Sequence, residues 1–246
     1  LAVSLFERTP KGISLTQAGL TLLRHAGPAV RTLEEGVKAL QAVQEGSHWL
    51  RIGALSTAES RLLPEALRRW QVDTATERGA QVVTGTSAFL LSRLRRGELD
   101  VVVGRMTEAR EIHDLSCEHL YYERLQLVVR AGHPLLAEQG LTADKLCAYP
   151  WIVPPPQTTL RQQVDSFFVR HGLSLPTQRI ETLSLALGLH YTLIGEAIWV
   201  APEEAVRSAQ QREELYELTL PLELNGGSVG LCINRSLHPT LATEAF

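Results

Sequence analysis

Three pairs of hydroxyl side chains stand where they could help to bind a small anion. Each pair follows a strand-like apolar segment and precedes a helical one: Ser56–Thr57, Thr86–Ser87 and Thr158–Thr159. In open α/β sheets, ligands bind beyond the carboxyl ends of strands, where helix N-termini present free N–H groups. Each N-terminus favours an anion by about 0.3–1 kcal/mol. Capping of the helix alone is the equal alternative for each pair, because Ser and Thr are common N-caps.

A cation and a proline-rich loop accompany these hydroxyls. Arg105 follows an apolar run, and its guanidinium could bind a carboxylate through two hydrogen bonds; a solvated surface arginine is the alternative. Pro155 stands in the three-proline loop before the third pair. We expect no acidic residue beside these strand ends. The sequence therefore predicts a site for a small organic anion, formed by Ser56, Thr57, Thr86, Ser87, Arg105, Pro155, Thr158 and Thr159.

Patterns typical of catalysis or of metal binding do not occur in the sequence. There is no Gly-x-Ser-x-Gly elbow, no P-loop, no HExxH and no Gly-x-Gly-x-x-Gly. The cysteines Cys117, Cys147 and Cys232 lie far apart without the spacing of a zinc site, so we expect reduced thiols in a cytoplasmic protein. We expect no catalytic residue, no metal and no cofactor, and therefore a protein that is not an enzyme.

The segments that would position this site alternate between strand and helix. After residue 48, short apolar segments alternate with helical ones in two successive sets, with a turn at His133–Pro134 before the second. Apolar strands separated by helices are typical of a parallel sheet covered on both faces, so the sequence predicts an α/β fold. The chain of 246 residues, 44% of them hydrophobic, suffices for a full-sized core. No apolar run approaches membrane-spanning length.

A long helix is expected from Thr16 to about Gln44. Apolar residues recur there at alternating steps of three and four, and a seam this narrow favours pairing of helices between subunits. Packing of the helix on its own domain is the alternative. Pro28 lacks a backbone N–H and should kink or split the helix. The predicted dimerisation residues are Leu23, Val30, Leu33, Val37 and Leu40.

The chain starts with a predicted β-hairpin. Two short apolar segments, Leu5–Phe6 and Ile13–Leu15, flank a turn at Pro10–Gly12, and Thr16 is the expected N-cap of the helix. The net charge of −3 means that any affinity for DNA must be local, and the hairpin is the basic local element. Residues at its tip could contact DNA phosphates: Arg8, Thr9 and Lys11.

These segments resemble LysR-type transcriptional regulators. The hairpin resembles the wing that ends the winged helix-turn-helix of the family, with matches at Leu5, Phe6, Arg8, Gly12, Leu15, Thr16, Ala18 and Gly19. Later matches fall at Leu94, Gly97, Leu99, Asp100, Gly132–Leu135 and Tyr149–Trp151. Gly195–Ala197 departs from the Gly-x-Gly turn frequent in the family. The surroundings of Trp70 and the ending Val101–Arg105 resemble the activators of protocatechuate operons.

The resemblance implies two Rossmann-like lobes of the type 2 periplasmic-binding-protein fold, joined by two crossover strands and preceded by a wing and a linker helix. The implied domains are residues 1–46 for the truncated DNA-binding part and linker helix, 49–124 completed by 232–246 for lobe I, and 125–231 for lobe II. Because the helix-turn-helix precedes the wing in this family, we expect a fragment trimmed at both ends.

The implied function is that of a cytoplasmic, ligand-responsive regulator of transcription. Its partners would be DNA, a small anionic effector in the cleft between the lobes, and further copies of the chain in a homodimer or homotetramer. The subgroup resemblance implies an aromatic carboxylate or a ring-cleavage product as effector. The alternative is a solute-binding receptor of a transport system, which shares the two-lobed fold. The wing and the heptad seam favour the regulator.

Overall fold

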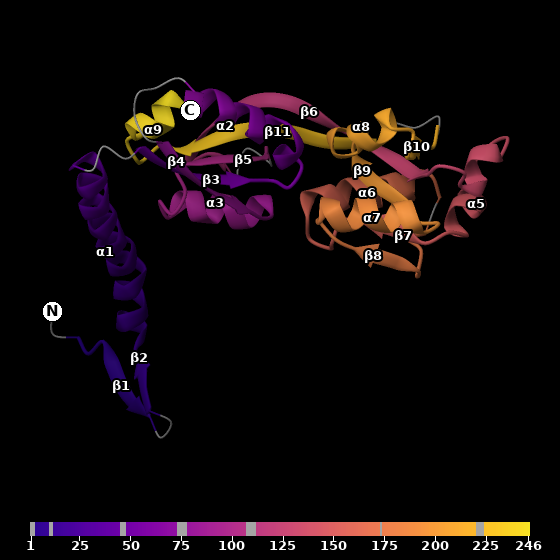
Figure 1. Cartoon of the computed structure of the whole chain (residues 1–246). Helices are drawn as coiled ribbons and strands as arrows, with labels where there is room; N and C mark the ends of the chain where they lie inside the picture. The colour runs from indigo at the N-terminus through magenta and orange to yellow at the C-terminus, as the bar shows by residue number, and fades with distance from the viewer. Residues whose placement is uncertain are drawn as a thin grey trace. The chain divides into compact units, whose positions relative to one another are not determined.

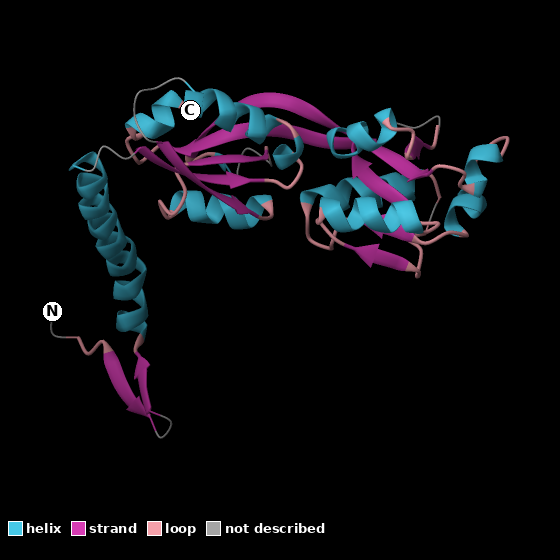
Figure 2. Ribbon diagram, in the orientation of Figure 1, coloured by secondary structure: helices cyan, strands magenta, loops and turns pink. Residues whose placement is uncertain are grey.

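The computed structural model describes residues 3–9, 12–44, 48–72, 78–106, 112–172, 174–219 and 224–246. The chain divides into two compact units. The first comprises Leu1–Trp49 with Thr74–Gly79, and the second comprises Leu50–Asp73 with Ala80–Phe246. Figure 1 labels the helices and strands, and Figure 2 colours them by type.

The first unit contains the expected hairpin. Strands β1 (Phe6–Thr9) and β2 (Gly12–Leu15) pair antiparallel. The hydroxyl of Thr16 accepts a hydrogen bond from the N–H of Gly19 over 3.1 Å, which confirms Thr16 as the cap of the following helix. Gly19 allows this close junction, because a Cβ there would lie 2.1 Å from the carbonyl oxygen of Leu5.

Helix α1 (Gln17–Gln44) is continuous through Gly27 and Pro28. The expected split at Pro28 is therefore wrong. A proline removes one backbone hydrogen bond of a helix, whereas a helix of 28 residues retains those of its other turns.

The second unit is built on one large sheet. The described residues form nine strands in the order β4-β3-β5-β11-β6-β9-β7-β8, and β10 also pairs with β6. The strand bounds are β3 (His48–Ala54), β4 (Arg78–Thr84), β5 (Val101–Arg105), β6 (Leu115–Arg130), β7 (Trp151–Val153), β8 (Arg179–Glu181), β9 (Ile198–Pro202), β10 (Leu215–Glu217) and β11 (Leu224–Asn234).

Helices cover both faces of this sheet, as expected for buried parallel strands. Their bounds are α2 (Leu62–Val72), α3 (Ser87–Arg95), α5 (Ala143–Cys147), α6 (Thr159–Arg170), α7 (Leu185–Ile194), α8 (Glu203–Gln211) and α9 (Leu241–Ala245), with short 3-10 turns η1 (Ala58–Ser60) and η2 (Pro134–Ala137). In lobe I, defined as β3, β4 and β5 with α2 and α3, the two helices lie on opposite faces of the strands (Figure 1).

Lobe II, defined as β7, β8 and β9 with α6, α7 and α8, repeats this arrangement with its own core. Phe167 and Phe168 of α6 pack on one face of its strands, and Val206 of α8 packs on the other. Strands β3 and β5 of lobe I are parallel, as are β7 and both of its neighbours in lobe II. The predicted α/β fold of two lobes is confirmed.

Strands β6 and β11 connect the two lobes. They pair antiparallel with each other from Leu115 opposite Asn234 to Leu125 opposite Leu224. In lobe I, β11 also pairs with β5, and the second half of β6 pairs with β9 and β10 in lobe II. Two long, mutually paired strands thus hold the lobes together and leave a cleft beside them.

Cysteines Cys117 and Cys232 form a disulfide between β6 and β11. The expectation of reduced thiols is therefore wrong for this pair. The two residues are 115 positions apart in the chain, but the antiparallel register places them directly opposite each other with their Cα atoms 4.1 Å apart. Cys147 is exposed and takes part in no disulfide of the described residues; its thiol donates a hydrogen bond to the carbonyl oxygen of Ser174 over 3.7 Å.

Candidate effector cleft

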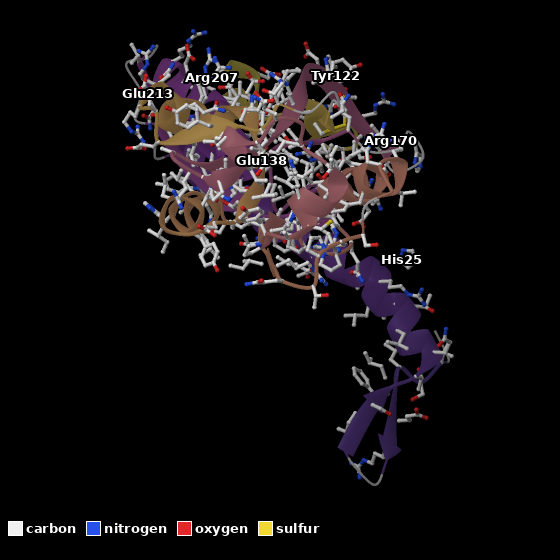
Figure 3. The ribbon with its side chains drawn as sticks, turned by 90° about the vertical axis from the view of Figure 1, so that its right-hand side faces the viewer. His25, Tyr122, Glu138, Arg170, Arg207 and Glu213 are labelled. Atoms are coloured by element: carbon white, nitrogen blue, oxygen red, sulfur yellow. A yellow bond between two sulfur atoms is a disulfide. The ribbon has the colours of Figure 1, made fainter. Side chains whose placement is uncertain are left out.

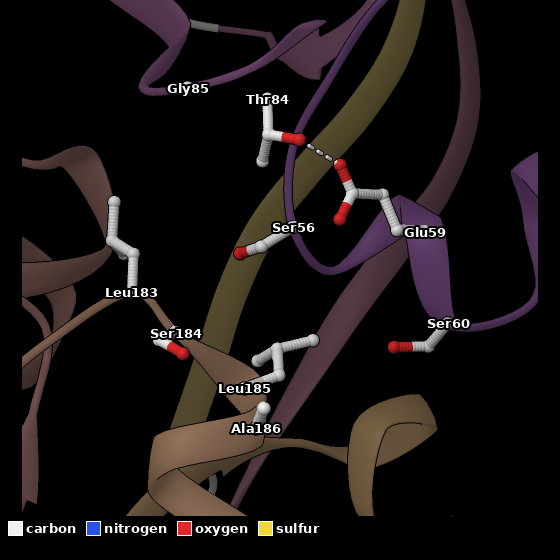
Figure 4. Close-up of a pocket in the computed structure, with 9 residues that line it drawn as sticks. All are labelled: Ser56, Glu59, Ser60, Thr84, Gly85, Leu183, Ser184, Leu185 and Ala186. Atoms are coloured by element: carbon white, nitrogen blue, oxygen red, sulfur yellow. Dashed lines mark hydrogen bonds between the residues drawn. The ribbon is translucent and has the colours of Figure 1, made fainter. Parts of the chain in front are cut away.

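A cavity of about 550 Å³ lies between the two lobes. Figure 4 shows the residues that line it, with the hydroxyl of Ser56 pointing into the gap between the lobes. The lining consists of Ser56, Glu59, Ser60, Thr84 and Gly85 from lobe I, and of Leu183, Ser184, Leu185 and Ala186 from lobe II.

A narrower cavity of about 60 Å³ adjoins the first and shares Ser56, Gly85 and Leu183 with it. The predicted residues that line it are Ser56, Thr57, Thr86, Ser87, Arg105, Thr158 and Thr159. Pro155 does not line it, but its carbonyl oxygen accepts a hydrogen bond from the Thr158 hydroxyl over 2.9 Å. The structure therefore brings together predicted residues from four separate parts of the sequence.

Three helices begin at this cleft, and a hydroxyl caps each of them. Thr86 accepts from the N–H of Phe89 at the start of α3, and Thr158 accepts from that of Arg161 at the start of α6. Ser184, which is not among the predicted residues, caps α7: its hydroxyl accepts from the N–H of Leu187 over 3.2 Å. The remaining N–H groups of these first turns give the cleft a partial positive charge from both lobes.

The other predicted hydroxyls differ in their availability to a ligand. Among the described residues, Ser56 Oγ forms no hydrogen bond, so it can donate or accept. Thr57 Oγ1 is buried and has no partner within the described chain. The hydroxyl of Ser87 accepts from the backbone N–H of Arg105 over 3.1 Å. Ser56 and Thr159 are therefore the predicted hydroxyls that are partly exposed and form no hydrogen bond with the described residues.

Arg105 lines the narrower cavity, but its guanidinium is buried and already paired within the protein. The residue is 4% exposed, and its guanidinium donates hydrogen bonds to the carboxylate of Glu123 on β6 and to the carbonyl oxygen of Gly226 on β11. A buried cation needs such a partner, since desolvation of an unpaired charge is costly. The alternative of a solvated surface arginine is therefore wrong, and contact of Arg105 with a ligand carboxylate stays a prediction; its charge is neutralised by Glu123.

The expectation that no acidic residue borders the cleft is also wrong. Glu59 of η1 lines the larger cavity, and its carboxylate accepts a hydrogen bond from the hydroxyl of Thr84 at the end of β4 (Figure 4). The sequence does contain a signal for Glu59. It follows Ser56 by three residues, and a helical turn places residues at this spacing on the same side.

A separate cavity of about 380 Å³ lies beside β6, between η1–α2 of lobe I and α8 of lobe II. A guanidinium nitrogen of Arg61 lies 3.4 Å from a carboxylate oxygen of Glu204 across this cavity. Figure 3 labels Tyr122, which also lines the cavity, and Arg207, which lies on α8 with Glu204. Burial, with Glu123 nearby, raises the pKa of Tyr121 to about 12, so its hydroxyl is protonated at neutral pH.

The predicted dimerisation residues form an exposed apolar row on α1. Exposed fractions are 55% for Leu23, 54% for Val30, 72% for Leu33 and 56% for Val37. The side chain of Leu40 lies outside the described residues.

The wing residues are described only in part. Arg8 is exposed and lies opposite Ile13 in the hairpin. Thr9 belongs to β1, its side chain lies outside the described residues, and Lys11 lies outside them entirely.

Within the ranges given above, no three His, Cys, Asp or Glu residues are grouped as metal ligands. Across those ranges, every helix is too short or too polar to span a membrane.

Comparisons with known proteins agree on one family. A family model described as the LysR substrate binding domain matches residues 44–246. The HTH-type transcriptional regulator PcaQ of Agrobacterium fabrum is 36% identical over 244 residues, covering 98% of this chain and 78% of that protein. The crystal structure of CbnR, a LysR family transcriptional regulator, covers 99% of this chain and 83% of its own with a TM-score of 0.60 and 20% identity. The effector binding domain of QuiR in complex with shikimate covers 80% of this chain and 93% of its own, with a TM-score of 0.64 and 17% identity.

Proposed function

Since this chain belongs to the LysR family of ligand-responsive transcriptional regulators, we propose that the cleft between its two lobes binds a small organic anion as effector. The observation that carries the proposal is the meeting of three helix N-termini, from α3, α6 and α7, at one cleft. Their free N–H groups can receive a carboxylate without a dedicated cation. An aromatic carboxylate or a ring-cleavage acid is the class indicated by the resemblance to protocatechuate-operon activators.

In this proposal the carboxylate lies in the narrower cavity, where the first turns of α3 and α6 face each other. Ser56 donates a hydrogen bond to it from lobe I, while Thr86 and Thr158 fix the two helix starts. Ser87 and Arg105 support the lobe I side, Thr57 and Thr159 line the remaining wall, and Pro155 holds the Thr158 hydroxyl through its carbonyl oxygen. Because the ligand contacts both lobes, its binding shifts the protein toward lobe arrangements that preserve both sets of contacts.

Family membership confirms the regulator interpretation over that of a transport receptor. Regulators of this family bind DNA and assemble as oligomers. We assign the DNA contacts of this chain to wing residues Arg8, Thr9 and Lys11, and its subunit contacts to the row formed by Leu23, Val30, Leu33, Val37 and Leu40. Residues 1–46 would thus serve DNA binding and assembly, while lobe I (49–124, completed by 232–246) and lobe II (125–231) serve effector binding. The protein would act in the cytoplasm, by binding rather than by catalysis.

The anion assignment is tested by calorimetry with benzoate and benzamide, which share a shape and differ in charge. We expect benzoate to bind more tightly. Ser56→Ala should weaken benzoate binding about three- to tenfold, since a hydrogen bond of this kind contributes roughly 0.5–1.5 kcal/mol. The matched control is Ser166→Ala on α6, whose hydroxyl bonds to the carbonyl of Gln162 outside both cavities. Equal affinity for benzamide and benzoate, or preferential binding of neutral sugars, would contradict the proposal.

A further inference from the structure

Glu59 places a negative charge in the larger part of the cleft, whereas the helix N-termini carry a partial positive charge. Among the residues that line the two adjoining cavities, the charged side chains are Glu59 and Arg105. Arg105 is neutralised by Glu123, which does not line either cavity. The charge that the lining presents to a ligand is therefore the carboxylate of Glu59.

The position of Glu59 is defined by its contacts. One carboxylate oxygen accepts from the hydroxyl of Thr84, and the other points away from Thr84 into the cavity (Figure 4). No cation pairs with Glu59 in the described chain. Its second oxygen can therefore accept a hydrogen bond from a ligand, and the hydroxyls of Ser60 and Ser184 line the same cavity.

A ligand held by its carboxylate at the starts of α3 and α6 would extend from the narrower cavity into the larger one, because the two share Ser56, Gly85 and Leu183. At Glu59 a hydroxyl or an ammonium group can donate a hydrogen bond to the carboxylate. A second carboxylate would meet a like charge without a compensating cation, which is unfavourable.

We infer that Glu59 selects the effector by the group at the end of the ligand opposite the bound carboxylate. The preferred ligand is then a monocarboxylic acid that bears a hydroxyl or amino group there, rather than a di- or tricarboxylate. This inference rests on the proposed binding of an anion in the cleft. It narrows the candidate class toward hydroxylated or aminated aromatic acids and away from ring-cleavage products that carry several carboxylates.

The test is calorimetry of the chain with benzoate, 4-hydroxybenzoate, 4-aminobenzoate and terephthalate, the last of which replaces the donor by a second carboxylate. The wild type should bind the hydroxy and amino acids at least tenfold more tightly than terephthalate. Glu59→Gln should reduce this preference about tenfold or more, since its amide can donate to a carboxylate. Glu138→Gln, an exposed glutamate of lobe II bonded to Lys145, is the control (Figure 3).

The outcomes separate this inference from the proposal beneath it. If benzoate binds but the preference over terephthalate is the same in the wild type and in Glu59→Gln, the role of Glu59 is wrong and the anion site stands. If Glu138→Gln reduces the preference as strongly as Glu59→Gln does, the effect does not arise in the cleft and the inference is also wrong. If none of the four acids binds the wild type, the anion site itself is refuted, and the inference with it.

Discussion

Replacing Glu123 by Gln should destabilise the effector-binding domain strongly, because it leaves the cation of Arg105 without its counter-ion. Both side chains are almost completely buried, with 5% of Arg105 and 6% of Glu123 exposed, so water cannot take the place of the lost charge. Removing one partner of a buried pair costs about 3–5 kcal/mol. The carbonyl of Gly226 remains as an acceptor for Arg105, which places the expected cost at the lower end, about 3 kcal/mol.

The assay is thermal denaturation at pH 7 followed by circular dichroism. For a chain of this size, 3 kcal/mol corresponds to a decrease in melting temperature of roughly 6–12 °C. The matched control is Glu65→Gln, whose partner Arg69 is 71% exposed and whose loss should cost less than about 1 kcal/mol. The double variant Arg105→Met with Glu123→Leu should be more stable than Glu123→Gln, because it removes both buried charges. A cost for Glu123→Gln no larger than that of the control would refute the reasoning.

Two further predictions concern a buried histidine and the long helix. His133 is 2% exposed, its Nδ1 accepts from the N–H of Leu135, and burial lowers its pKa. Because His133 is protonated more easily in the unfolded state, the free energy of unfolding should be highest above about pH 6.5 and should decrease as the pH drops below that value. Urea titrations between pH 8 and 5.5 measure this dependence, and His25→Gln should leave it unchanged. A free energy of unfolding that does not vary with pH would contradict the prediction. Leu33→Asp should lower the mass measured by light scattering, because it places a charge in the proposed subunit contact. The control Leu33→Met keeps an apolar side chain and should not change the mass. An unchanged mass for Leu33→Asp would exclude that contact.

Local features of the fold could be predicted from the sequence because their causes lie within a few residues. The hairpin follows from two short apolar segments around a turn, and the caps at Thr16, Thr86 and Thr158 follow from a hydroxyl placed before a helical pattern. The alternation of strands and helices likewise predicted two α/β lobes. These patterns also identified most of the described residues that line the narrower cavity, but only Ser56 among those that line the larger one.

The features that the sequence did not reveal depend on the register between distant strands. Glu123 meets Arg105 because β11 joins their two strands, and Cys117 meets Cys232 through the pairing of β6 with β11. No local spacing encodes either contact. The inward direction of Glu59 depends on the path of the chain after β3, which a count of residues does not give.

The most direct measurement of the central claim is a crystal structure of the chain with bound 4-hydroxybenzoate. The account predicts that the ligand carboxylate lies within hydrogen-bond distance of first-turn N–H groups of α3 or α6 and of the hydroxyl of Ser56, between the two lobes. A ligand found only in the cavity beside Tyr121, or bound with its carboxylate away from these helix starts, would contradict it.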